Sequence, residues 1–149
     1  MEIRKVSDEF SVSGQLTPEA LPALKAAGVR TLICNRPDRE APDQPDRVML
    51  EERARALGME VHYLPVVHDT INARNVEDFA ALLRQSAAPV HAWCRSGLRS
   101  ITLYSLSRVK EGADPVAQVA NAAQVGFDFR SFPDKFAPVI AELQRNGSR

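Results

Sequence analysis

The chain has 149 residues, a charged fraction of 26% and a formal net charge of zero, so it is long enough for one domain with its own core. A neutral chain without a run of lysines and arginines has no field that attracts nucleic acid, and we expect no nucleic-acid partner. No apolar run approaches the roughly 18 residues of a membrane span, and the N-terminus has no apolar signal segment. We therefore expect no membrane association and a cytoplasmic location.

Strand-like and helix-like segments alternate along the chain. Short runs rich in apolar or β-branched residues predict strands at 11–15, 29–35, 59–66 and 89–94. Amphipathic segments with caps, several of which end at a glycine, predict helices at 17–28, 47–58, 76–87, 98–112, 114–126 and 133–144. Thr17 and Pro18 are expected to start the first of these helices. The alternation predicts an α/β fold, with a parallel-sheet core flanked by helices in a single domain over residues 1–149.

The stretch HAWCRSGLRS, residues 91–100, contains the strongest candidate site. Cys94 ends a predicted strand shortly before a helix, where unpaired N–H groups and the helix dipole stabilise a thiolate. Gly97 lets the backbone approach an anion closely, and the planar group of Arg99 suits two oxygens of a tetrahedral oxyanion. Ser100 can donate a hydrogen bond to the sulfur. We therefore predict Cys94 as a nucleophile.

The predicted anion-binding loop consists of Arg95, Ser96, Gly97, Leu98 and Arg99. A structural alternative is that Cys94 is a small core residue and that Arg95 and Arg99 are ordinary surface charges. We favour the catalytic interpretation because of the order of the features: a strand is followed by cysteine, glycine, arginine and serine, and then by a helix. This whole pattern is far more specific for a catalytic loop than a lone cysteine is.

Polar residues follow two other predicted strands and could reach the same edge of the sheet. Asp69, in VVHDT, follows one of these strands, and an aspartate in such a segment is often a turn former or a cap. The segment NRPDRE places Arg36, Asp38 and Glu40 either at the pocket rim or in a solvated charged loop. The sequence alone leaves these alternatives open.

The remaining cysteine and the histidines have simpler interpretations. Cys34 lies inside a predicted strand and is expected to be inert, unless its side chain faces Cys94 and can resolve an oxidised or persulfidated sulfur. His91 points to the strand face opposite Cys94, so we expect a packed histidine rather than a base. No Cys/His cluster has zinc spacing, and neither a Walker loop nor a dinucleotide fingerprint is present. We expect no metal and no cofactor.

Two resemblances point in different directions. CRSGLRS resembles the active-site loop of rhodaneses, sulfurtransferases that carry sulfur as a cysteine persulfide, in having four residues between Cys94 and Arg99. The loop of cysteine-dependent phosphatases has five, usually with a histidine where this chain has Trp93. FSVSGQLTPEALPALKAAGVRTLICNRPDRE instead resembles the N-terminal half of small dual-specificity phosphatases, and the order of elements agrees along nearly all of the chain.

One family combines both features, namely the phosphatase-like domain found alone or fused to beta-lactamase-hydrolase-like proteins, and the chain resembles its members. The resemblance implies a dual-specificity-phosphatase-like fold and an enzyme with a covalent cysteinyl intermediate. A shorter loop suits a smaller group than phosphoryl, so the expected chemistry is sulfur transfer through a Cys94 persulfide, from a small anionic or persulfide donor to a thiol acceptor. One alternative is hydrolysis of a phosphoester through a phosphocysteine with Asp69 as acid. Another is a non-catalytic module that senses anions or redox state.

Overall fold

Five strands form one sheet in the computed structural model, which describes residues 2–147. The strands are β1 (Arg4–Lys5), β2 (Phe10–Ser13), β3 (Thr31–Cys34), β4 (Glu60–Tyr63) and β5 (Val90–Trp93). Their order across the sheet is β1-β2-β5-β3-β4, and all neighbours are parallel except β1 and β2. The predicted α/β fold with a parallel core is therefore confirmed, and the antiparallel edge strand β1 was not predicted. With two residues, β1 is too short to show a periodic pattern.

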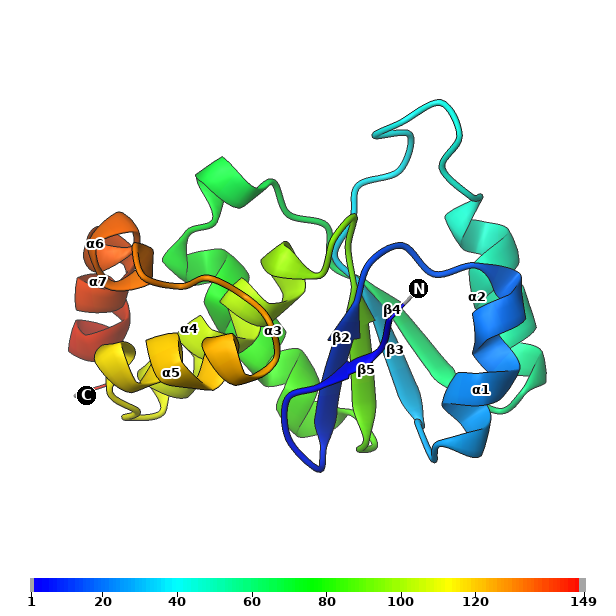
Figure 1. The fold of residues 1–149 in the computed structure, drawn as a ribbon, viewed down its shortest axis with the longest axis horizontal. Helices are drawn as coiled ribbons and strands as arrows, with labels where there is room; N and C mark the ends of the chain where they lie inside the picture. The colour runs from blue at the N-terminus through cyan, green and yellow to red at the C-terminus, as the bar shows by residue number, and fades with distance from the viewer. Residues whose placement is uncertain (1, 148–149) are drawn as a thin grey trace.

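Helices cover both faces of this sheet (Figure 1). The α-helices are α1 (Leu21–Ala26), α2 (Arg47–Ala56), α3 (Ala73–Gln85), α4 (Leu98–Lys110), α5 (Pro115–Gln124), α6 (Phe132–Lys135) and α7 (Ala137–Gly147). Two short 3-10 helices are η1 (Pro18–Ala20) and η2 (His68–Thr70). In Figure 1, α1 and α2 lie on one side of the sheet, and α3 to α7 lie on the other.

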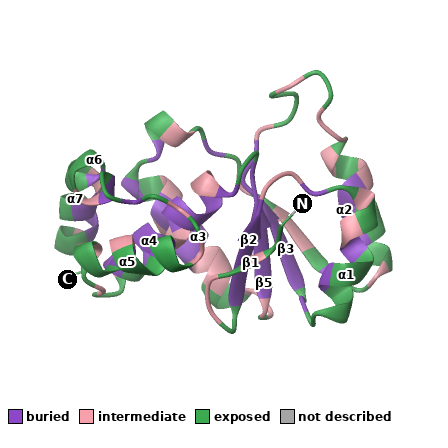
Figure 2. Cartoon of the chain, viewed as in Figure 1, coloured by how far each residue is buried: buried purple, intermediate pink, exposed green. Residues whose placement is uncertain are grey.

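The two faces of the sheet have separate apolar cores. One core joins β2, β3 and β5 to α3, α4 and α7, and it includes Val12, Phe79, Leu103 and Leu143. The other joins α1 and α2 to Leu32 and Trp93. Burial on both faces explains why β3 and β5 are buried along their whole length (Figure 2). These strands therefore lie in the middle of the molecule, and their carboxyl ends provide a fixed edge.

Three predicted helices differ from the structure, and one of them, α3, begins at Ala73 rather than at residue 76, with Asn72 as its cap. The first helix begins as the 3-10 turn η1, and the Thr17 side chain forms no cap hydrogen bond, although Pro18 stands in the first turn as expected. The final helix, predicted as one segment, is divided into α6 and α7 around Phe136. Phe136 is buried in the core, so tertiary packing decides where this segment bends.

Candidate active site

Cys94 lies at the bottom of a loop that connects β5 to α4. Its side chain is only 1% exposed. The backbone N–H of Gly97 donates to the Cys94 sulfur at 3.1 Å, and Gly97 is the N-cap of α4 with φ of +94°. A glycine is required at this φ, because other residues rarely adopt it. The loop thus directs a backbone amide and the start of a helix toward the sulfur, as the sequence predicted.

The connection from β2 to η1 supports this loop from one side. The N–H of Gln15 donates to the carbonyl of Arg95 at 3.3 Å. A Cβ on Gly14 would lie 2.9 Å from the same carbonyl oxygen, so a side chain there would displace the loop. Gly14 is a residue that the sequence reasoning missed. Its only signal is the dipeptide Ser-Gly at the end of the first predicted strand.

Arg99 is held by a carboxylate from another segment. Its two terminal nitrogens donate to Glu40 at 2.6 and 2.8 Å, and Nη1 also donates to the Val66 carbonyl at 3.0 Å. The hydrogen bond to Glu40 raises the pKa of Arg99, and the neighbouring Cys94 raises it further against the effect of burial. The same contact lowers the pKa of Glu40 to about 2. The guanidinium therefore stays charged and is fixed beside the sulfur.

Glu40 also connects Arg99 to the rest of the β3–α2 loop. Arg36 is 5% exposed, and it donates through Nε to Glu40 at 3.0 Å and through Nη1 to Gln15 at 2.9 Å. The sequence left open whether the NRPDRE segment lies at the rim of the site or forms a solvated charged loop. In the structure, Arg36 and Glu40 lie in the site. Asp38 instead binds Arg47 through both carboxylate oxygens, at 3.0 and 3.2 Å, and so stabilises the outer part of the loop.

From the sequence we expected that the Ser100 hydroxyl could donate a hydrogen bond to the Cys94 sulfur. In the structure this hydroxyl donates to a different partner. It donates to Asn35 Oδ1 at 2.8 Å, and Asn35 in turn donates to the Leu64 carbonyl at 2.9 Å. Both polar residues are fully buried at 0% exposure, and a buried hydroxyl keeps the partner that satisfies it best. Ser100 therefore ties the start of α4 to the ends of β3 and β4. Sequence reasoning missed Asn35, whose position directly after a buried strand was the available signal.

The other residues of the predicted anion-binding loop have different surroundings. The side chains of Arg95 and Ser96 are exposed, and Leu98 packs against the larger core. The Leu98 N–H donates to the Ser96 hydroxyl at 3.3 Å, which closes the first turn before α4. The loop therefore exposes its first two side chains and turns Leu98 toward the core.

Asp69, the candidate acid, lies in η2 and is bound to the C-terminal half of the chain. Its carboxylate is 87% exposed and lies 3.7 Å from the Lys135 ammonium and 3.8 Å from His68 Nδ1. Burial lowers the pKa of His68, and Lys135 lowers it further. The adjacent segment 66–67 reaches the site directly, since Val66 accepts from Arg99. Asp69 therefore lies three positions after a residue that contacts Arg99, and its own carboxylate is exposed and pairs with Lys135.

Cys34 is placed away from Cys94. In the parallel pairing of β3 and β5, Cys34 is opposite Trp93, and both side chains belong to the core under α1 and α2. The thiol donates to the Arg36 carbonyl at 3.3 Å, and burial raises its pKa to about 12. These surroundings support the inert interpretation of Cys34.

His91 is a packed residue, as expected, and links β5 to β2. Its Nδ1 lies 2.7 Å from the Ser11 hydroxyl and its Nε2 lies 2.8 Å from the Ser13 hydroxyl. Because Ser13 donates its own proton to the Gly14 carbonyl at 2.8 Å, Nε2 must carry a proton and Nδ1 must accept from Ser11. Burial lowers the pKa of His91 to about 3, so the ring is neutral.

No group of three or more histidines, cysteines or acidic residues within residues 2–147 could hold a metal ion. In the same part of the chain, none of the helices has the length and apolar character needed to cross a bilayer.

Three comparisons with known proteins point to the same class of protein. The profile of the family described as "Beta-lactamase hydrolase-like protein, phosphatase-like domain" matches residues 2–111. A beta-lactamase hydrolase-like protein of Agrobacterium fabrum is 30% identical over 129 residues, which are 86% of this chain and 30% of that protein. A Xylella fastidiosa protein of the same name is 30% identical over 131 residues. The chain thus spans less than a third of the length of these curated relatives.

Solved structures have the same fold. A Neisseria meningitidis Z2491 protein, provisionally named a phosphatase, superimposes with a TM-score of 0.85 at 31% identity, over 93% of this chain and 99% of that one. TpbA of P. aeruginosa, solved in complex with pTyr, has a TM-score of 0.73 at 18% identity, covering 99% of this chain and 90% of its own. PTPMT1 has a TM-score of 0.76 at 13% identity, covering 99% of both chains. The last two similarities concern the fold alone.

The sheet order, the buried cysteine at a strand end and the arginine beside it define a member of the cysteine-based phosphatase-like superfamily. Within it, the chain belongs to the phosphatase-like domain family of beta-lactamase hydrolase-like proteins. The resemblance drawn from the sequence is therefore confirmed. The comparisons give no support to sulfur transfer as the leading chemistry.

Proposed function

We propose that this domain hydrolyses phosphomonoesters through a phosphocysteine on Cys94. The observation that carries the proposal is the guanidinium of Arg99, fixed by Glu40 beside the sulfur that the Gly97 amide contacts. This combination provides a nucleophile and positive charge at one point, which is what phosphoryl transfer requires. The substrate is a small anionic phosphoester, and the family of the chain supports this reaction class.

The reaction has two displacement steps. In the first, the Cys94 thiolate attacks phosphorus, an S–P bond forms, and the P–O bond to the leaving alcohol breaks. Donors on Arg99 that Glu40 and Val66 leave free, together with the loop amides, balance the negative charge of the equatorial oxygens. In the second step, water attacks phosphorus, the S–P bond breaks, and inorganic phosphate and the thiolate are released.

The leaving alcohol needs a proton when the P–O bond breaks, and Asp69 is the residue we propose for it. Its position in η2, directly after the segment that contacts Arg99, supports this role. Use of Asp69 requires its side chain to leave Lys135, take up a proton from solvent, and turn the resulting carboxylic acid toward the substrate. An exposed ion pair of this kind contributes about 0–1 kcal/mol, so the contact is weak enough to exchange.

Sulfur transfer is a second candidate, favoured by the loop length. Four residues lie between Cys94 and Arg99, as in the rhodanese loop that this segment resembles. In this reaction the thiolate attacks the outer sulfur of thiosulfate, an S–S bond forms on Cys94, and sulfite leaves. A thiol acceptor then removes the outer sulfur and restores the Cys94 thiolate. No proton donor is needed, because sulfite is a stable leaving group.

Intact-protein mass spectrometry separates these reactions. After incubation with p-nitrophenyl phosphate and acid quench, phosphoester hydrolysis predicts a phosphate adduct and release of nitrophenol with the wild type only. Cys94→Ser should fold and give neither, whereas Cys34→Ser should retain both. An adduct of one sulfur with thiosulfate, and none with the phosphoester, would instead establish the second candidate. Absence of both adducts and of turnover would favour the non-catalytic interpretation.

Replacement of Asp69 tests the proton donor. Asp69→Asn should lower kcat for an alkyl phosphate about 100-fold, because general acid catalysis contributes about 10²–10⁴. The effect should be much smaller with p-nitrophenyl phosphate, whose leaving group needs no proton. Asp134→Asn, a change of another exposed aspartate, is the control. Equal kcat values for Asp69→Asn and the wild type with the alkyl ester would remove Asp69 from the mechanism.

A further inference from the structure

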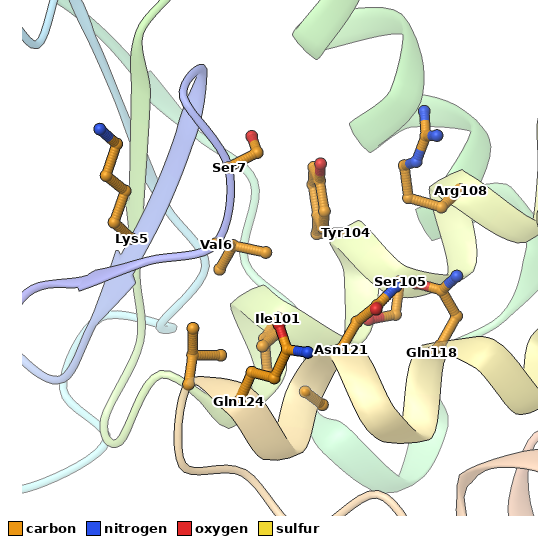
Figure 3. Close-up of a pocket in the computed structure, with 12 residues that line it drawn as sticks. Lys5, Val6, Ser7, Ile101, Tyr104, Ser105, Arg108, Gln118, Asn121 and Gln124 are labelled. Carbon is orange, nitrogen blue, oxygen red and sulfur yellow. The ribbon is translucent and has the colours of Figure 1, made fainter.

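A cavity of about 480 Å³ lies between the β1–β2 connection and helices α4 and α5. Figure 3 shows the side chains that line it, with Tyr104, Ser105 and Arg108 from α4 and Gln118 and Asn121 from α5. We call it the α4–α5 cavity. Its lining includes neither Glu40, Asp69 nor any residue of the Cys94 loop. The proposed reaction gives it no role, and its volume is in the range of small-molecule sites, about 300–1,000 Å³.

The charged residues in the cavity lining are both cations. Lys5 and Arg108 stand on opposite sides of the labelled group in Figure 3, and the lining includes no acidic residue. Lys5 pairs with Asp8 at 3.5 Å and Arg108 with Glu111 at 3.2 Å, and both pairs are exposed. Exposed pairs of this kind contribute little. An incoming anion can therefore take either cation from its present partner at small cost.

Ser105 supplies a second and independent observation. Three other hydroxyl groups on α4 are satisfied within the protein: Ser100 donates to Asn35, Thr102 to the Leu98 carbonyl and Ser107 to the Leu103 carbonyl. Ser105 is 4% exposed and lines the cavity, and its hydroxyl forms no hydrogen bond within residues 2–147. The Ser105 oxygen is not among the fully buried unpaired atoms of the described residues, so it is accessible from the cavity that the residue lines. The cavity is the open side on which a ligand can supply one.

Helix α5 adds carboxamide groups to the same wall. Gln118 is 4% exposed, and its amide nitrogen makes one long contact, 3.5 Å to the Asp114 carbonyl. Asn121 and Gln124 also line the cavity. Ile101 and Ala122 provide an apolar floor. The lining is therefore mainly polar, with a small apolar base, and such a lining suits a polar anion better than an apolar ligand.

We propose that the α4–α5 cavity binds a small organic anion. A phosphate or carboxylate group of the ligand pairs with Arg108 or Lys5, and its polar body hydrogen bonds to Ser105 and to the carboxamides of α5. This site is separate from the Cys94 loop and does not depend on the reaction catalysed there.

Titration of the ¹⁵N-labelled chain tests the site residue by residue. The probes are AMP, which carries a phosphate, and citrate, which carries carboxylates. Cys94→Ser serves as the background so that AMP is not turned over. We expect at least one probe to shift the amide resonances of Val6, Ser105 and Asn121 in a saturable way, with a Kd below about 1 mM, a value that corresponds to −4.1 kcal/mol. The probe that binds identifies which anion the site prefers.

Paired variants provide the controls. In that background, Arg108→Glu should weaken binding at these resonances at least tenfold, and Arg145→Glu, the same charge change on α7, should alter it less than twofold. Ser105→Ala should weaken binding several-fold, whereas Ser107→Ala should not. Shifts confined to the Cys94 loop with both probes, or equal responses of Arg108→Glu and Arg145→Glu, would overturn the proposal.

Discussion

At the scale of single residues, the site depends on one carboxylate that brings two arginines together. Glu40 accepts from both Arg99 and Arg36. Its lowered pKa, about 2, keeps it ionised. The usual carboxyl value of Glu is about 4.3, so this stabilisation is complete above that pH and is lost as the pH falls toward 2. Glu40 is thus a positioning residue, because it acts on the substrate through Arg99.

Glu40→Gln should test this role. The neutral amide cannot form the same bidentate contact, so Arg99 becomes free to rotate, and we expect kcat/KM to fall about tenfold, equivalent to about 1.4 kcal/mol. The measurement is steady-state hydrolysis of an aryl phosphate, with thermal unfolding to show that the fold is retained. Glu52→Gln, a change on the exposed face of α2, is the control. An unchanged kcat/KM for Glu40→Gln would show that Arg99 needs no carboxylate to hold it.

At the scale of elements, the junction between β5 and α4 determines the geometry of the loop. Gly97 combines a φ of +94° with a tight environment, because an added Cβ would lie 3.1 Å from Phe127 Cζ and 3.3 Å from the Ser13 carbonyl oxygen. Gly28 has a similar φ of +91°, with nothing within 4 Å of an added Cβ. A side chain at either glycine would be strained by the positive φ, but only a side chain at Gly97 would also be crowded by its neighbours.

Gly97→Ala and Gly28→Ala form a matched pair. The backbone strain common to both should cost about 1–3 kcal/mol of unfolding free energy. Gly97→Ala should cost more than Gly28→Ala, because Phe127 and Ser13 must also move, and it alone should abolish turnover. Urea unfolding and an activity assay measure these effects. Equal losses of stability, with turnover retained in Gly97→Ala, would show that the loop tolerates a side chain.

The β2–β5 pair contains a second element-scale feature, the neutral His91. Its pKa in the folded protein, about 3, is below the unfolded value of about 6.5, so the unfolded chain takes up the proton first. The free energy of unfolding should therefore be unaffected by this group above about pH 6.5. It should decrease by at most about 1.4 kcal/mol per pH unit as the pH falls from about 6.5 toward 3.

Urea unfolding at pH 7, 6 and 5 can isolate this effect. His91→Gln should be less stable than the wild type at pH 7, because the contacts to Ser11 and Ser13 change, but should lose less stability between pH 7 and 5. His62→Gln, at a partly exposed position of β4, should keep the wild-type pH dependence. If His91→Gln and the wild type lose equal stability over this range, the buried ring does not cause the acid sensitivity.

At the scale of the whole molecule, the fold extends beyond the segment that the family profile matches. The profile ends at residue 111, whereas the larger core also includes five large apolar side chains from the C-terminal segment. They are Phe129, Phe132, Phe136, Ile140 and Leu143. At about 1.5–3 kcal/mol for each buried side chain, their contribution is comparable with the total stability of a domain, about 5–15 kcal/mol.

A chain that ends at residue 111 should therefore fail to fold cooperatively. We expect its thermal unfolding, followed by circular dichroism, to lack the sigmoidal transition of the full chain. A chain that ends at residue 147 should retain that transition. If the shorter chain unfolds at the temperature of the full chain, the helices α5 to α7 are an appendage rather than part of the core.

The α/β class, the four parallel strands and the place of Cys94, Gly97 and Arg99 between a strand and a helix could all be predicted from the sequence. These features are local or periodic, so neighbouring residues are enough to reveal them. The hydrogen-bond partners of the site residues, in contrast, could be identified only from the folded molecule. Glu40 is 59 positions from Arg99 and Asn35 is 65 positions from Ser100. No local pattern encodes such a contact, because it exists only after the parallel strands bring their carboxyl ends to one edge.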